Sequence, residues 1–73
     1  MIKTNELKAQ MKRLDMTQKD LANAIGMDPA TLNRKINNEQ GSVVTVKEAN
    51  EIASALQIPR EMMTDIFFAP ELA

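Results

Sequence analysis

The chain has 73 residues, which is enough for one domain with a modest hydrophobic core. It contains neither Cys nor His, which excludes disulfides, Cys-based zinc sites, the commonest metal ligand and the usual proton shuttle. No apolar run approaches the roughly 20 residues that span a bilayer, and the first six residues hold no apolar signal core. We therefore expect a soluble cytoplasmic domain over 1–73, with no membrane contact, metal, cofactor or catalytic residue.

Charge is distributed unevenly along the chain, although the net charge is only -1. Residues 1–40 hold seven Lys or Arg against five Asp or Glu, whereas residues 41–73 hold two against five. Nucleic-acid binding requires cations that meet phosphates. Any nucleic-acid surface is therefore expected in the first half.

The first helix is predicted from apolar spacings of four and three, which put three residues on one helix face. Thr4 or Asn5 is expected to cap its start, and Asp15-Met16 to end it. The stripe consists of Leu7, Met11 and Leu14.

Two further helices are predicted around a three-residue turn. Thr17 is expected to cap the first through the amide of Asp20, and Gly26 suits a left-handed turn at its end. Asp28 is a good cap for the next helix, and Pro29 suits its first position. The apolar faces are formed by Leu21, Ala22, Ile25, Leu32 and Ile36.

The remaining chain predicts a loop over 37–42 and two more helices. Val43-Val44 is prone to form a strand, but two residues cannot make a sheet. A capping box at Thr45–Glu48 begins a helix over about 46–57, with its stripe at Val46, Ala49, Ile52, Ala53 and Leu56. Pro59 begins a short last helix that carries Met62, Met63 and Ile66, and Pro70 ends it. Five helices and no strand predict an all-α fold.

The segment from Thr17 to Asn37 therefore has the pattern helix, tight turn, helix. Ala22 is small where the two helices cross, and Met27 is expected to fill the core at the corner. The residues that stand out in and after this segment are Gln18, Leu21-Ala22, Ile25-Gly26-Met27, Thr31-Leu32, Arg34 and Leu56-Gln57-Ile58-Pro59. In these residues the chain resembles the Cro/C1-type (XRE, phage-repressor-like) helix-turn-helix family, over roughly residues 5–66.

The resemblance implies a compact five-helix domain, with the motif at about 17–37 and helix 29–37 in the DNA major groove. It also implies that Gln18 anchors a phosphate. A rotation of about 100° per residue from the apolar face turns Ala30, Arg34 and Asn37 outward, with Thr31 and Asn33 beside them. Arg34 suits guanine, Asn33 or Asn37 suits adenine, and Ala30 suits a thymine methyl group. With Lys19 and Lys35 as phosphate contacts, the predicted DNA-binding residues are Gln18, Lys19, Ala30, Thr31, Asn33, Arg34, Lys35 and Asn37.

The sequence thus predicts a sequence-specific transcriptional regulator of phage or prophage type that binds double-stranded DNA as a homodimer. One of Phe67 and Phe68 is expected to close the core. The other, with Ile66 and Leu72, would form a contact patch within 66–73 for a second chain.

One other function is open to the sequence. Pro29 and Ala30 lie where the family often places polar base readers, and neither offers a side-chain hydrogen bond. Together with the acidic second half, this leaves open an antirepressor or modulator that binds a phage repressor protein instead of DNA. An enzyme is rejected because no constellation of residues supports catalysis.

Overall fold

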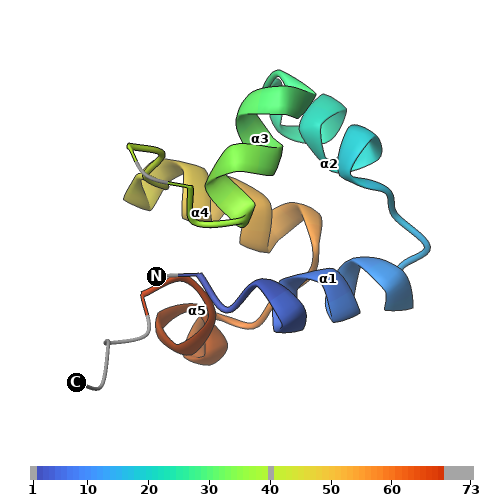
Figure 1. The fold of residues 1–73 in the computed structure, drawn as a ribbon. Coiled ribbons are helices and arrows are strands. Elements are labelled where there is room, and N and C mark those ends of the chain that lie inside the picture. Colours follow the sequence, from blue (N-terminus) through green and yellow to red (C-terminus); the bar gives the residue numbers. More distant parts are fainter. Residues whose placement is uncertain (1, 40, 69–73) are drawn as a thin grey trace.

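Five helices follow one another along the chain in the computed structural model, which describes residues 2–39 and 41–68 (Figure 1). They are α1 (Thr4–Arg13), α2 (Gln18–Ile25), α3 (Pro29–Ile36), α4 (Val46–Ala55) and α5 (Arg60–Phe67). These described residues contain no strand, as the all-α prediction requires. None of the helices is long and apolar enough to cross a membrane.

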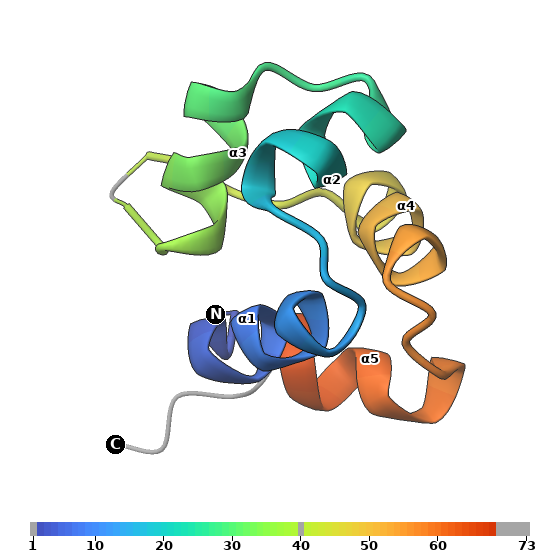
Figure 2. The ribbon, with the colours of Figure 1, turned by 90° about the vertical axis from the view of Figure 1, so that its right-hand side faces the viewer.

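The helices are arranged so that α2 and α3 lie together on one side and α1 and α5 on the other (Figures 1 and 2). Helix α4 contacts both α2 and α5 and so links the two pairs. The radius of gyration of the Cα atoms is 11.3 Å. All five helices therefore surround one core.

The core is apolar throughout, because the buried residues of the described chain include no polar or charged side chain. Every helix contributes to it, which explains how helices of only 8 to 10 residues are stable. Its largest fully buried side chains are Leu7, Leu21, Leu32, Ile36, Ile52, Leu56 and Phe67.

The predicted helix starts are confirmed for the three central helices. Thr17 and Asp20 form a reciprocal capping box on α2, and Thr45 and Glu48 form another on α4. The Asp28 carboxylate accepts hydrogen bonds from the first free amides of α3. The predicted cap of α1 is wrong: Lys3 occupies that position without a side-chain hydrogen bond, and the Thr4 hydroxyl bonds elsewhere.

The ends of α1, α2, α3 and α4 share one geometry. In each, two or three backbone amides beyond the helix donate to carbonyls of its last turn, and one residue is left-handed. That residue is Gly26 after α2 (φ 69°), as predicted, but Asp15, Asn38 and Gln57 after the other three (φ 53–58°). These three residues occupy a conformation that favours glycine.

Other expectations need correction. Helix α3 ends at Ile36 and α4 at Ala55, slightly before the predicted bounds. Val46 is 66% exposed instead of buried, because it begins α4 beside a shallow hollow between α2 and α4. Ile66 is buried and cannot belong to a contact patch, while Leu72 and Pro70 lie outside the described residues.

Candidate nucleic-acid interface

Helix α3 is held from behind by α2. Leu21 and Ala22 on α2, and Leu32 and Ile36 on α3, are all 0% exposed. The left-handed Gly26 turns the chain sharply between the two helices, and Met27 packs against the core at this corner. The inner face of α3 is thus fully used by packing, which leaves its outer face for a ligand.

The outer face carries the residues that the sequence predicted. Ala30, Asn33, Arg34 and Asn37 are exposed, and Thr31 is half-buried. Asn37 is the residue that caps the end of α3 and is not part of the helix. The structure therefore brings the five candidate base-contacting residues together along one side of α3.

Hydrogen bonds join these side chains in pairs. The Asn37 Nδ2 donates to Asn33 Oδ1 at 2.8 Å and to the Asn33 carbonyl at 2.9 Å. The Arg34 Nη2 donates to Thr31 Oγ1 at 3.4 Å. The first pair uses an acceptor of Asn33 and a donor of Asn37, so the NH2 group of Asn33 and the carbonyl of Asn37 can still meet a ligand. Pairing also reduces the side-chain entropy that binding would cost.

The start of α2 presents the other predicted residues. Gln18 is its first residue and is half-buried, and the following Lys19 is exposed. The capping box uses the Asp20 amide, so the amides of Gln18 and Lys19 point out of the helix end, where anions bind favourably. Hydrogen bonds from the Thr17 backbone and side chain lower the pKa of Asp20, which is therefore charged at neutral pH.

Lys35 has a partner that the sequence did not indicate. Its Nζ lies 2.8 Å from both carboxylate oxygens of Glu48, and the two side chains are only 18% and 21% exposed. The Lys35 bond, followed by one from the Thr45 amide, lowers the pKa of Glu48. The capping box identified Glu48 at the start of α4, but nothing local links it to Lys35, 13 residues earlier.

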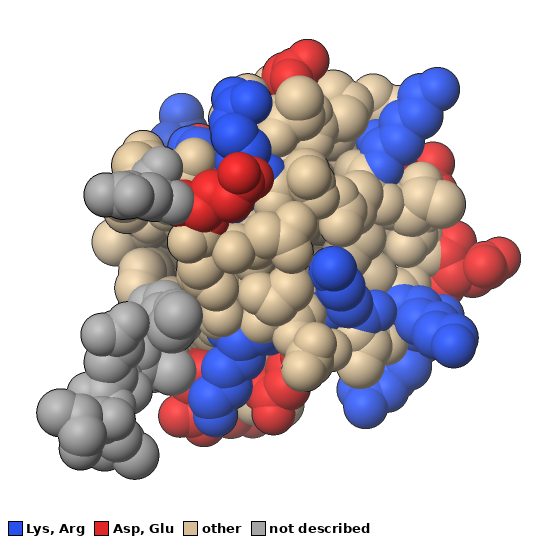
Figure 3. Space-filling model, in the orientation of Figure 1, with Lys and Arg blue, Asp and Glu red and all other residues tan. Residues whose placement is uncertain are grey.

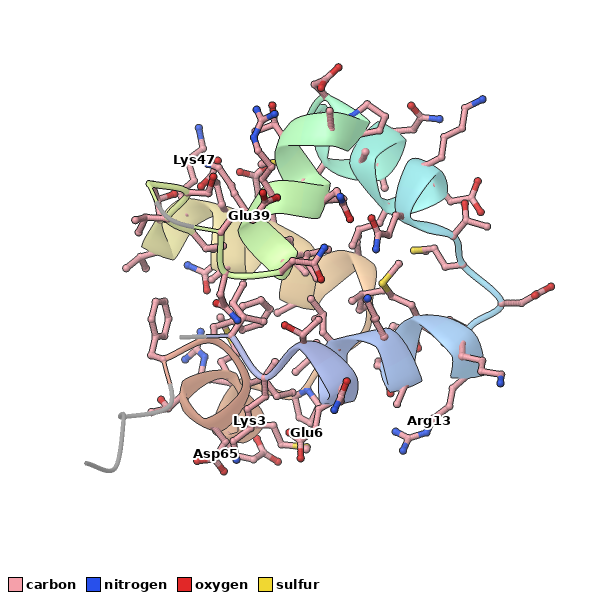
Figure 4. All side chains as sticks on the ribbon, viewed as in Figure 1. Lys3, Glu6, Arg13, Glu39, Lys47 and Asp65 are labelled. Carbon is pink, nitrogen blue, oxygen red and sulfur yellow. The ribbon has the colours of Figure 1, made fainter. Side chains whose placement is uncertain are left out.

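On the face that Figure 3 shows, the basic side chains of the described residues do not gather into one continuous patch. On the face viewed in Figure 3, Lys and Arg alternate with Asp and Glu, and much of the surface is uncharged. Figure 4 shows Glu39 beside α3 and Lys47 at the start of α4, whereas Lys3 and Arg13 lie at the opposite edge, below α1. The outer face of α3 therefore offers a few placed polar groups and no strong concentration of positive charge.

Comparison with protein families matches this arrangement to the family model described as Helix-turn-helix, over residues 7–62. The match covers more than three quarters of the chain and includes α2, the Gly26 corner and α3. Comparisons with curated proteins and with solved structures gave no significant match. The chain therefore belongs to the Cro/C1-type (XRE) helix-turn-helix family, a family of DNA-binding regulators.

Proposed function

We propose that this chain is a sequence-specific transcriptional regulator of phage or prophage type that inserts α3 into the major groove of double-stranded DNA. The observation that carries the proposal is the division of α3 into two faces. Leu32 and Ile36 are wholly buried, while Asn33, Arg34 and Asn37 are exposed on the other side. A helix anchored in this way can enter a groove without losing its packing.

The proposed base contacts follow from the chemistry of each side chain. Arg34 donates to the O6 and N7 atoms of guanine, and Ala30 contacts a thymine methyl group. The free donor on Asn33 and the free acceptor on Asn37 match the N7 and N6 groups of adenine. Thr31, which accepts from Arg34, orients the guanidinium.

Phosphate contacts are proposed at the two ends of this surface. Gln18, Lys19 and their amides lie at the start of α2, where the helix dipole favours an anion. Lys35 lies near the end of α3 and is also proposed to contact a phosphate. Its charge is balanced by Glu48, so it adds less to phosphate attraction than Lys19 does.

We further propose that the chain acts as a homodimer, because two copies are needed to read paired half-sites one helical turn apart. Phe67 closes the core, so Phe68 is left for the contact surface. It is 41% exposed and lines one hollow together with Val43, which is 72% exposed. Sedimentation of Phe68→Ser beside the native chain tests this surface, and an unchanged dimer would reject it.

A mobility-shift experiment with the DNA that flanks the gene, at stated salt, tests the main proposal. Arg34→Ala is expected to relax preference at one base pair by about 1–3 kcal/mol. Arg13→Ala is the matched control, since Arg13 is also exposed and donates to a residue three positions earlier, Gln10. It lies at the opposite edge of the molecule in Figure 4 and should leave preference unchanged. Equal effects of both substitutions would reject the proposal.

An antirepressor or modulator that binds a phage repressor is the second candidate function. It is favoured by the apolar side chains Val43, Val46 and Phe68, which remain exposed, and by the lack of polar groups at Pro29 and Ala30. Titration of the chain with the repressor encoded beside its gene, followed by light scattering, tests this alternative. A mixed complex that survives Arg34→Ala would support it, and separate species would exclude that repressor as the partner.

A further inference from the structure

The first described residues pass between the ends of two helices that are distant in sequence. Ile2, Lys3 and Thr4, here called the N-terminal strap, run beneath the end of α3 and beside the end of α5 (Figure 1). The Lys3 amide donates to the Ile66 carbonyl at 2.7 Å. The side chain of Ile2 is 5% exposed and belongs to the core. The strap is thus anchored to α5 and to the core.

The side chain of Asn38 binds this strap as a second backbone would. Its Oδ1 accepts from the Ile2 amide and its Nδ2 donates to the Ile2 carbonyl, both at 2.9 Å. The Thr4 hydroxyl donates to the Ile36 carbonyl at 2.6 Å. A carbonyl in the last turn of a helix has no partner within the helix, so Thr4 satisfies a group that would otherwise need water.

These bonds hold the part of α3 that carries a proposed base contact. Asn37 lies between Ile36 and Asn38, both of which are bound to the strap, and its own side chain holds Asn33. Helix α3 has only eight residues and would fray at its end without such support. Glycine at position 38 would satisfy the left-handed backbone at φ 58° but could not bind Ile2.

We propose that Asn38 and Thr4 are positioning residues for base readout, which hold the end of α3 against the N-terminal strap. The inference rests on the proposed insertion of α3 into the major groove. Asn38 and Thr4 touch no base. They act through Asn37 and Asn33, whereas the side chain of Arg34 bonds to Thr31, which is one turn earlier and away from the strap.

The test uses the full chain and a DNA duplex selected from random sequence by the native protein. Asn38→Gly keeps the left-handed turn and removes both bonds to Ile2, and Thr4→Val removes the hydroxyl alone. Each variant is measured on the selected duplex and on its single-base variants, at a temperature where circular dichroism shows it fully folded. Asp15→Gly is the matched control, because Asp15 is left-handed without such bonds to a distant segment.

Asn38→Gly should reduce discrimination roughly three- to tenfold, which corresponds to one or two lost hydrogen bonds. The reduction should fall on the base positions that Asn33→Ala also relaxes and spare those that Arg34→Ala relaxes. Thr4→Val should affect the same positions, and Asp15→Gly none. A uniform loss over all positions would show a merely structural role and overturn the inference.

Two further results keep the test decisive. If Asn38→Gly does not fold, Asn38→Asp keeps the acceptor for the Ile2 amide but turns a carboxylate oxygen toward the Ile2 carbonyl, and should relax the same positions. If either variant discriminates between bases as well as the native chain does, while Arg34→Ala still relaxes discrimination, the positioning role is overturned and the proposed function stands. A native chain that selects no duplex overturns the proposed function, and the positioning role with it.

Discussion

The ion pair between Lys35 and Glu48 can be tested by Glu48→Gln. Glutamine keeps an oxygen for the Thr45 amide, so the capping box on α4 is retained, while the charge and one of the two acceptors of Lys35 are removed. A hydrogen bond to a charged group contributes about 1.5–3 kcal/mol, whereas an exposed ion pair contributes about 0.2–1 kcal/mol. The two side chains are 18% and 21% exposed, between these cases. We therefore expect Glu48→Gln to cost about 1–2 kcal/mol of unfolding free energy at pH 7.

The pH dependence of this loss has a definite sign. The folded chain holds the pKa of Glu48 below its usual value of 4.5. As the pH falls, Glu48 therefore takes up its proton at a higher pH in the unfolded state than in the folded state. The contribution of the ion pair to folding stability is complete above pH 4.5. It is lost as the pH falls through the lower pKa of the folded state. The difference in stability between the native chain and Glu48→Gln should disappear over that interval.

Urea unfolding followed by circular dichroism is the suitable assay, since the chain has neither Trp nor Tyr for fluorescence. Lys35→Met, Glu48→Gln and the double variant complete a cycle that isolates the pair from the separate effects of each substitution. A coupling energy of zero, or a stability difference that persists unchanged through acid pH, would refute the reasoning. The same variants test the phosphate contact proposed for Lys35, through the salt dependence of DNA binding.

Three further substitutions give measurable outcomes. Gln57→Gly should raise the unfolding free energy by about 1 kcal/mol, because it relieves a left-handed residue at φ 56°; a lower value in urea unfolding would contradict this. Phe67→Ala should cost about 3–5 kcal/mol, because the ring is buried, whereas the exposed Phe68→Ala should change thermal stability of the monomer little. Equal losses of stability in the two variants would contradict the burial of Phe67 and the exposure of Phe68. Thr17→Ala should cost about 1 kcal/mol and raise the pKa of Asp20 only part of the way toward its usual value, because the larger cause, the hydrogen bond from the backbone amide of residue 17, is retained; NMR titration can follow this.

The sequence predicted the parts of this fold that depend on local interactions. Periodic apolar residues and neighbouring caps identified all five helices, and Gly26 identified the corner between α2 and α3. A rotation of 100° per residue from Leu32 and Ile36 was enough to predict which residues of α3 are exposed. Such signals depend on residues that lie within one or two turns of each other.

The features that the sequence did not predict depend on distant pairs. Asn38 binds Ile2, 36 residues away, and Lys35 binds Glu48, 13 residues away. A repeating pattern of apolar residues cannot predict either contact. Thr4 resembled a cap for α1, but its hydroxyl reaches the end of α3. The left-handed residues Asp15 and Gln57 were also not expected, because no glycine marks either position.

The mixture of charges in Figure 3 has a consequence for how this regulator would search a genome. Random DNA attracts a protein almost entirely through cations that displace counterions, and this chain carries a net charge of -1. Few molecules should then be sequestered on irrelevant sequence, so a larger fraction diffuses freely at any moment. Occupancy of a target site would then follow changes in the number of protein molecules closely. The chain would also slide less along DNA, a movement that brings more basic regulators to their sites.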